Sequence, residues 1–389
     1  YIILYQKMKK INIENLLVNI VVAIVVFFNA ISTTMLDRTF FQVKANYLFV
    51  VVLLLGLRFL YKMRISYKYL VLSILLLLTG IVVYLQTGRL NFLVYSTLLV
   101  FLVNVDMKVI LKNYIFVSSI VLIVVFILSL LGIVPNLQYN RGGVIRNSFG
   151  FIYPTDFASH CFYLFIAYSY LLKDRLIWMR SIVGLLLAAF VIKYCDARLN
   201  ALSILLATII YIYFYVVGEK KLRIYAILPY SVLIFSSLMM YLSYMFSWSS
   251  PFLVSINKLI TGRLALGRNA FSSFTLNLFG TRDVLFIGSG GKTEAVVGYN
   301  YVDSSYVQML FTYGIVPVVL LIIIYIISAK EQYRKGQYLY VAILSIIALN
   351  CMIEAFWFVP SFNIFIFMLF STNTFDRIKL NDNFSQIIA

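Results

Sequence analysis

Residues able to do phosphate and proton-transfer chemistry lie close together in the second half of the chain. The polar segment 247–302 carries Arg263 and Arg268, and Asp303 follows it in the stretch "YVDSSYVQMLFTYG". An arginine guanidinium makes forked hydrogen bonds to phosphate oxygens, and a well-placed carboxylate accepts the proton of a reacting hydroxyl. These residue types favour a reaction on a phosphorylated ligand. Asp followed by two serines is also an ordinary helix N-cap, which is the competing interpretation of Asp303.

The residues around the two arginines predict an amphipathic helix from Ile256 to Gly280. Its apolar residues recur at helical spacing, and Arg263 projects from the same apolar face as Ile256. A charge on an apolar face is costly unless it is paired, so we expect Arg263 to face a buried anion. The alternative is a helix break at Gly262 or Gly267 that leaves both arginines in solvent.

Two further arginines, Arg141 and Arg146, lie in the polar segment 134–154. The apolar run that follows carries Asp156 and His160, which share a helix face because they are four positions apart. His160 is the only histidine of the chain, and an ionisable side chain within a membrane span is by default a functional candidate. A polar packing contact is the alternative interpretation of His160.

Arg198 stands two positions after Asp196 in "YCDARLNALS", at the mouth of a short apolar run. This arginine either contacts a ligand or forms a local ion pair with Asp196. Near the end of the chain, Glu354 is a further carboxylate between two apolar runs. Together with His160, it is a weaker candidate for a catalytic base than Asp303.

The composition places the whole chain in a membrane. Hydrophobic residues make up 63% of it and charged residues only 12%, with a mean hydropathy of +0.96. A soluble domain carries about 25% charged residues, so a chain this poor in charge could not cover a surface that faces water. The apolar runs are continuous, unlike the alternating pattern of membrane strands. We therefore predict an all-α, polytopic integral membrane protein.

About 20 apolar residues are needed to cross a bilayer, and the chain contains about twelve candidate spans within a single transmembrane domain, residues 1–389. They are 15–34, 46–61, 69–86, 90–104, 114–133, 155–172, 180–194, 200–217, 224–246, 303–328, 338–353 and 357–371. Most of the predicted outer loops are short. The exceptions are a smaller loop at 134–154 and a large one at 247–302, between the ninth and tenth spans. A large late loop is typical of a lid over a membrane-embedded cavity.

The basic residues predict the orientation of these spans. With the N-terminus in the cytoplasm, the inner segments hold 20 of the 32 lysines and arginines, and the positive-inside rule then places both termini in the cytoplasm. This distribution accounts for the net charge of +18 without a nucleic-acid partner. Eight of the twelve basic residues that remain outside are arginines, which again favours an anionic ligand at the outer face.

No cofactor or metal ion is expected. The three cysteines, Cys161, Cys195 and Cys351, lie in or beside apolar runs at unrelated spacing, which argues against a disulfide framework and a metal site. The glycine-rich stretch "FIGSGGKTEAVVGYN" (286–300) lacks the spacing of a nucleotide phosphate loop. We expect it to form turns that let the backbone approach a ligand.

Four stretches resemble the motifs of one protein family. "RNSFGFIYPTDF" (146–157) is similar to its R-x-S-G-F-x-x-P-N/D entry to a mid-chain span, and "DARLNALS" (196–203) to its S-R-x-x-x-L-x segment. "TGRLALGRNAF" (261–271), with the "LFG" and "LFIGSGG" that follow it, resembles its G-R-x-x-L and F-G-x-G elements. "VDSSYVQMLFTYGIV" (302–316) resembles its D/H-N/S-x-Y-L-x-x-L-x-x-x-G signature. By the order and spacing of these motifs, the chain resembles the O-antigen ligase/polymerase family, and in particular its Wzy-type polymerases of capsular or exopolysaccharide repeat units.

The resemblance implies a GT-C-like membrane glycosyltransferase that uses undecaprenyl-diphosphate-linked oligosaccharides and no metal. It implies that Arg146, Arg198 and Arg263 hold the lipid diphosphate at the outer face of the bacterial cytoplasmic membrane. Asp303 stands where the related ligases carry a histidine proposed as the base, and this departure leaves the base open. Arg268 has no clear match and rests on the helix pattern alone.

The reaction expected from the resemblance is polymerisation of lipid-linked repeat units. A ligase that moves the glycan to a different acceptor and a flippase for the same lipid-linked sugar are the alternatives. Arg141 completes the set of expected diphosphate-binding residues. The expected partners are the lipid-linked oligosaccharide and the bilayer, together with a flippase and a chain-length regulator.

Overall fold

The computed structural model describes residues 13–41, 66–173, 175–218, 220, 222–294 and 296–372, and most of them are helical. Six described stretches are long and apolar enough to cross a bilayer. They are Tyr67–Thr87 (α4), Met107–Leu130 (α6), Ile177–Cys195 (α8, Ile177–Phe190, with a π-helical turn), Arg198–Val217 (α9), Arg223–Met245 (a 3-10 turn with α10, Ser231–Met245) and Ile315–Arg334 (α14). A helix satisfies all its backbone hydrogen bonds internally, as a bilayer demands. By the length and composition of these helices, the chain is a mostly helical membrane protein.

The other described elements are not among these six stretches. The helices among them are α2 (Ile13–Ile31), α5 (Asn91–Phe101), α7 (Pro154–Leu172), α11 (Pro251–Leu259), α12 (Arg263–Ser273), α13 (Ser305–Tyr313), α15 (Tyr338–Asn350) and α16 (Ile364–Phe367). Two strands, β1 (Gln138–Arg141) and β2 (Val144–Asn147), form an antiparallel hairpin. Tyr139 pairs with Arg146 across this hairpin, so the two side chains lie on the same face of it.

The observed spans differ from the expected twelve. Residues 357–371, predicted as a span, form buried turns and the short α16 instead. Apolar composition does not separate a helix that faces lipid from a core segment covered by protein, which explains this error. The runs at 90–104 and 338–353 form helices of only 11 and 13 residues. The predicted span 46–61 lies outside the described residues.

The predicted span 303–328 is broken at Gly314 into α13 and α14. Gly314 has a φ of 97°, and a Cβ at this position would lie 2.5 Å from the carbonyl oxygen of Leu278. The backbone of residues 277–280 packs directly against this junction, where Ile315 N donates to Asn277 O at 3.0 Å. The break therefore lets residues 277–280, which lead into the loop 281–302, pack against the start of α14.

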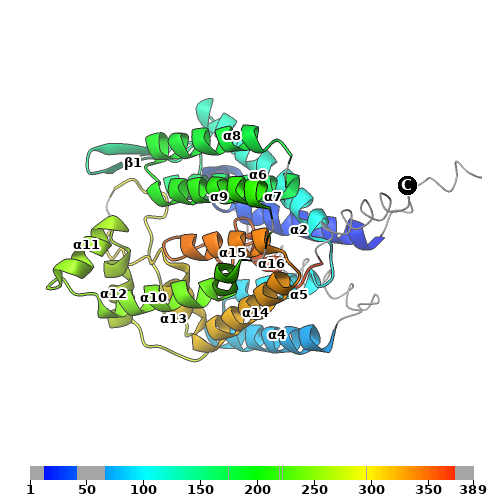
Figure 1. Ribbon diagram of the computed structural model, residues 1–389. Helices are drawn as coiled ribbons and strands as arrows, with labels where there is room; N and C mark the ends of the chain where they lie inside the picture. Colours follow the sequence, from blue (N-terminus) through cyan, green and yellow to red (C-terminus); the bar gives the residue numbers. More distant parts are fainter. Residues whose placement is uncertain are drawn as a thin grey trace, which may run out of the picture.

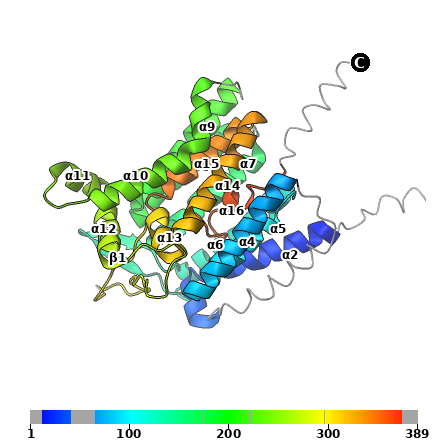
Figure 2. The same ribbon diagram turned by 90° about the horizontal axis from the view of Figure 1, so that it is seen from below.

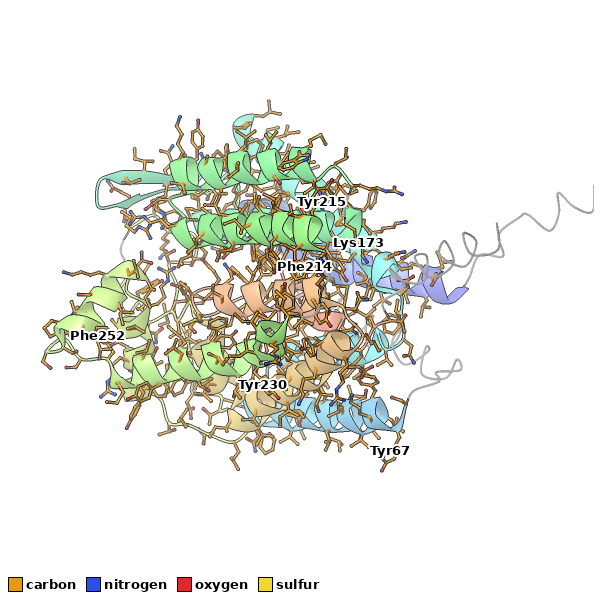
Figure 3. The ribbon with its side chains drawn as sticks, in the orientation of Figure 1. Tyr67, Lys173, Phe214, Tyr215, Tyr230 and Phe252 are labelled. Atoms are coloured by element: carbon orange, nitrogen blue, oxygen red, sulfur yellow. The ribbon has the colours of Figure 1, made fainter. Side chains whose placement is uncertain are left out.

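The long helices lie side by side, with α8, α9, α15, α14 and α4 following one another across the view in Figure 1. The β-hairpin, α11 and α12 all lie at one end of this bundle, which we call the loop end (Figure 1). Figure 2 shows α10 leading out to α11 and α12 at that end. The labelled side chains of Tyr67 and Lys173 lie at the opposite end from Phe252 of α11 (Figure 3).

Candidate active site

A cavity of about 440 Å³, which we call the main cavity, lies among the loop-end segments. The hairpin, the starts of α7 and α12, and the segments 299–303 and 354–356 contribute to its wall. A smaller neighbouring cavity shares Arg141, Arg146 and Arg263 with the main cavity and extends to Asp196 and Arg198. The structure thus brings four of the five predicted diphosphate-binding arginines to one place.

Arg263 reaches the main cavity because the chain turns sharply just before it. Thr261 and Gly262 have φ values of 55° and 91°, so α11 and α12 are separate helices and the expected continuous helix from Ile256 is wrong. Asn257 Oδ1 accepts hydrogen bonds from Leu264 N at 3.0 Å and Ala265 N at 3.1 Å, which caps the start of α12. The break at Gly262 does not leave Arg263 in solvent, since its side chain is only 12% exposed.

Arg263 faces the carboxylate of Asp303. Arg263 Nη2 lies 3.2 Å from Asp303 Oδ2, and another guanidinium nitrogen contacts Thr261. Arg263 Nε is buried and has no hydrogen-bond partner among the described residues. A buried donor without a partner is energetically costly, so this guanidinium has unused capacity to bind an anionic ligand.

Asp303 is not the N-cap of the following helix. Ser304 occupies that position, and Asp303 instead points to Arg263 from the wall of the main cavity, where its side chain is 25% exposed. Burial raises the pKa of Asp303 above its ordinary value, while the Arg263 and Arg146 guanidinium groups oppose this shift. The two guanidinium groups thus favour the ionised form of this carboxyl group, which can accept a proton, against the effect of burial.

The hairpin supplies Arg141 and Arg146. Arg146 Nε donates to Cys195 O at 2.9 Å, and burial together with the nearby Arg141 lowers the pKa of Arg146 to about 10. Arg141 is ion-paired with Asp196, and Arg198 Nε lies 2.9 Å from the other oxygen of that carboxylate. Burial would raise the pKa of Asp196, but the hydrogen bonds from both arginines outweigh it and lower the pKa. Arg198 therefore has the local ion pair that the sequence left open, and it also borders the smaller cavity.

Glu354 lines both cavities and is almost fully buried, with 5% of its surface exposed. Asn200 Nδ2 donates to Glu354 Oε1 at 3.2 Å, and Asn350 Nδ2 donates to Asn200 Oδ1 at 3.2 Å. These amides tie Glu354 to α9 and α15. Burial raises the pKa of Glu354 to about 8, against the opposing effect of Arg263. Glu354 is thus a second carboxyl group of the cavity, and its pKa lies close to neutral pH.

His160 lies one layer behind the cavity. Its Nε2 is 3.2 Å from Thr33 Oγ1, a residue of the cavity wall, and its ring stacks on Phe362 with the centroids 4.0 Å apart. Asp156, one helical turn earlier, does line the main cavity. Arg268 is not brought to either cavity, because it extends over the ring of Tyr244 and donates to the carbonyl of that residue at 2.6 Å.

Two other arginines expected at the outer face hold the loop 281–302. Arg89 donates to the carbonyl oxygens of Thr312 at 3.2 Å and Thr281 at 3.4 Å. Arg38 donates to the carbonyl of Gly290. These side chains hold in place the loop that carries Tyr299 and Tyr301 of the cavity wall. Some of the outer arginines therefore have a structural role.

Four tyrosines that no sequence motif pointed to also line the main cavity, Tyr139, Tyr153, Tyr299 and Tyr301. The chain contains 30 tyrosines, so no spacing singled these out. The glycine-rich segment lies beside the cavity wall, since Gly290 N donates to Tyr153 Oη at 2.9 Å, and its approach to a ligand stays a prediction.

Within the described part of the chain, no three His, Cys, Asp or Glu side chains gather as metal ligands would. No family model, curated protein or solved structure matches this chain. The chemistry of the cavity must therefore be argued from its own residues.

Proposed function

We propose that this protein is a membrane glycosyltransferase that polymerises undecaprenyl-diphosphate-linked oligosaccharide units into a capsular or exopolysaccharide. The observation that carries the proposal is the meeting of Arg141, Arg146 and Arg263 with the carboxyl groups of Asp303 and Glu354 in one cavity. The resemblance to Wzy-type polymerases rests on motifs that contribute several of these residues, and it supports the same reaction.

The arginines suit the diphosphate of a lipid-linked donor. In glycosyl transfer, negative charge develops on the leaving diphosphate as its bond to the sugar breaks. Guanidinium groups fixed in a largely buried site stabilise that charge without having to reorganise. Arg263 is the strongest candidate because it is nearly buried and one of its donors is unused among the described residues. Arg141 and Arg146 lie on the same wall.

A carboxylate of the cavity suits the acceptor. The hydroxyl oxygen of the acceptor sugar attacks the anomeric carbon of the donor, and a new glycosidic bond forms as the bond to the diphosphate breaks. The electron pair of the broken bond stays on the diphosphate, and the hydroxyl proton passes to the base. Asp303 is our first candidate for this base, with Glu354 as the alternative in the same cavity. His160 would act only through Thr33, because it does not line the cavity.

We further propose that the cavity faces the outside of the cytoplasmic membrane and that both termini lie in the cytoplasm. Tyr67 and Lys173 lie at the end of the bundle opposite to Phe252 (Figure 3). Lys68 directly follows Tyr67 in the chain, and Lys68 and Lys335 are both paired with Glu331. Basic residues collect in cytoplasmic segments, so that end suits the cytoplasm. A lipid carrier in the outer leaflet would then reach the arginines from the membrane.

Reconstitution of the purified protein in vesicles tests the reaction. Vesicles that hold lipid-linked repeat units from the host are expected to yield a ladder of lipid-linked polymers and free undecaprenyl diphosphate. A single transfer to a different acceptor, without a ladder, would identify a ligase. Movement of the lipid-linked unit across the bilayer with no new glycosidic bond would identify a flippase and refute the proposed reaction.

A further inference from the structure

The tyrosines of the main cavity form a second kind of surface beside the arginines. The rings of Tyr139 and Tyr153 have centroids 6.0 Å apart and are tilted by 33°. Tyr299 and Tyr301 come from the loop 281–302 and its exit and line the same cavity. We call Tyr139, Tyr153, Tyr299 and Tyr301 the tyrosine wall.

The tyrosine wall and the arginines differ in which of the two cavities they line. Both cavities contain Arg141, Arg146 and Arg263, whereas the tyrosine wall belongs to the main cavity alone. The smaller cavity continues instead to Arg198 and the carboxylate of Asp196. The arginines therefore border both cavities, and the tyrosines border the main cavity alone.

The tyrosine wall is held in place by hydrogen bonds that leave ring surface on the cavity. Tyr139 Oη donates to Ile152 O at 2.7 Å, and Tyr153 Oη accepts from Gly290 N at 2.9 Å. Gly288 lies so close that a Cβ on it would meet Tyr153 Oη at 2.9 Å. The loop backbone thus packs against the wall, and Arg38 fixes the same loop at the carbonyl of Gly290.

An aromatic wall with hydroxyl groups around it fits a sugar ring. A pyranose has apolar C–H faces, which carry partial positive charge and suit the negative face of an aromatic ring. Its rim of hydroxyls needs hydrogen-bonding partners, and Ser32, Thr33 and Asp156 on the same cavity wall offer them. A diphosphate would gain nothing from aromatic faces, so the two parts of the cavity suit different parts of the substrates.

We propose that the tyrosine wall is the binding subsite for the acceptor sugar, placed next to the arginines that hold the donor diphosphate. This inference rests on the proposed glycosyl transfer and assigns its second substrate. The acceptor hydroxyl would then lie between the tyrosine wall and the arginines, where Asp303 and Glu354 also line the cavity.

Direct binding measurements on the full-length protein in detergent distinguish ligand binding at the tyrosine wall from ligand binding at the arginines. The probes are inorganic pyrophosphate and the free oligosaccharide released by mild acid from the host's lipid-linked units, each titrated by calorimetry. Tyr299 is the residue to change, because it is 43% exposed and its hydroxyl makes no hydrogen bond within the described residues. Loss of its ring should leave the fold intact. Phe252→Ala is the matched control, since Phe252 is an exposed aromatic residue at the same end but outside both cavities (Figure 3).

Tyr299→Ala is expected to raise the Kd of the oligosaccharide about tenfold and to leave the Kd of pyrophosphate unchanged. Tyr299→Phe, which keeps the ring, and Phe252→Ala should bind both probes like the wild type. Equal oligosaccharide affinity in Tyr299→Ala and the wild type would overturn the subsite, as would a wild type that does not bind the oligosaccharide. Failure of the wild type to bind pyrophosphate would instead count against the proposed function, and the oligosaccharide titrations would still decide the subsite.

Discussion

Arg263 Nη2 lies 3.2 Å from Asp303 Oδ2, although the two residues are 40 positions apart in the chain. The pair joins the group that we assign to the donor diphosphate with the group that we assign to the acceptor proton. A bound diphosphate would compete with Asp303 for the same guanidinium. Donor binding would then weaken the hold of Arg263 on the carboxylate just when a base is needed.

Replacing Asp303 by Asn should distinguish its role as proton acceptor from its role as the partner of Arg263. Asp303→Asn removes the proton acceptor and is expected to lower kcat for polymerisation by about 10²- to 10⁴-fold. It also removes the anion that competes for Arg263, so pyrophosphate should bind more tightly than to the wild type. Both quantities are measurable on the reconstituted protein.

The same rate of polymerisation, measured for Glu354→Gln and His160→Ala, compares the three candidates for the base. Full-length polymer at the wild-type rate from Asp303→Asn would end the assignment of Asp303. If Glu354→Gln alone then lost polymerisation, the base would be Glu354.

Glu354 is expected to make the stability of the protein depend on pH. Burial raises its pKa from 4.5 to about 8, so the folded protein holds this proton more tightly than the unfolded chain. The stabilisation is complete below about pH 4.5 and is lost as the pH rises through about 8. Glu354→Gln resembles the protonated carboxyl and still offers an acceptor to Asn200. Its Tm in detergent should match that of the wild type near pH 5 and exceed it near pH 9. A difference in Tm that does not change with pH would contradict this account.

Part of the fold and of the site followed from the sequence for physical reasons. Long apolar runs such as Met107–Leu130 were predictable because a bilayer demands about 20 apolar residues. The helical position of Arg263 correctly suggested that it faces an anion, although the helix itself breaks at Gly262. The partner of Arg263 was not predictable, because nothing local links it to Asp303.

The burial of the segment 357–371 and the assembly of the tyrosine wall could not be predicted from the sequence. Trp357, Phe362 and Phe367 are as apolar as a membrane span, yet protein rather than lipid covers them. Tyr139 and Tyr299 line the same cavity only because the folded chain brings the hairpin and the loop 281–302 together. Contacts of this kind depend on tertiary structure and leave no periodic pattern in the chain.

Gly314 is expected to be the more sensitive of two comparable glycines. Gly314 and Gly336 both have positive φ, but a Cβ on Gly314 would collide with Leu278 O, whereas a Cβ on Gly336 would meet nothing within 4 Å. Gly336→Ala carries only the backbone strain of about 1–3 kcal/mol. Gly314→Ala adds the collision and should displace the start of the loop 281–302. A thermal unfolding scan should show the lower Tm for Gly314→Ala, and equal Tm values for the two variants would be inconsistent with the packing described above.

The polymerisation rate of Arg263→Ala, beside that of Arg282→Ala, tests the central claim most directly. Arg282 is an exposed arginine of the adjoining loop and lines neither cavity, so its loss controls for a general change in charge. In vesicles with lipid-linked repeat units, Arg263→Ala is expected to lower the rate of polymer formation by about 10²- to 10³-fold, while Arg282→Ala retains the wild-type rate. A polymer ladder from Arg263→Ala that forms as fast as that from Arg282→Ala would contradict the account.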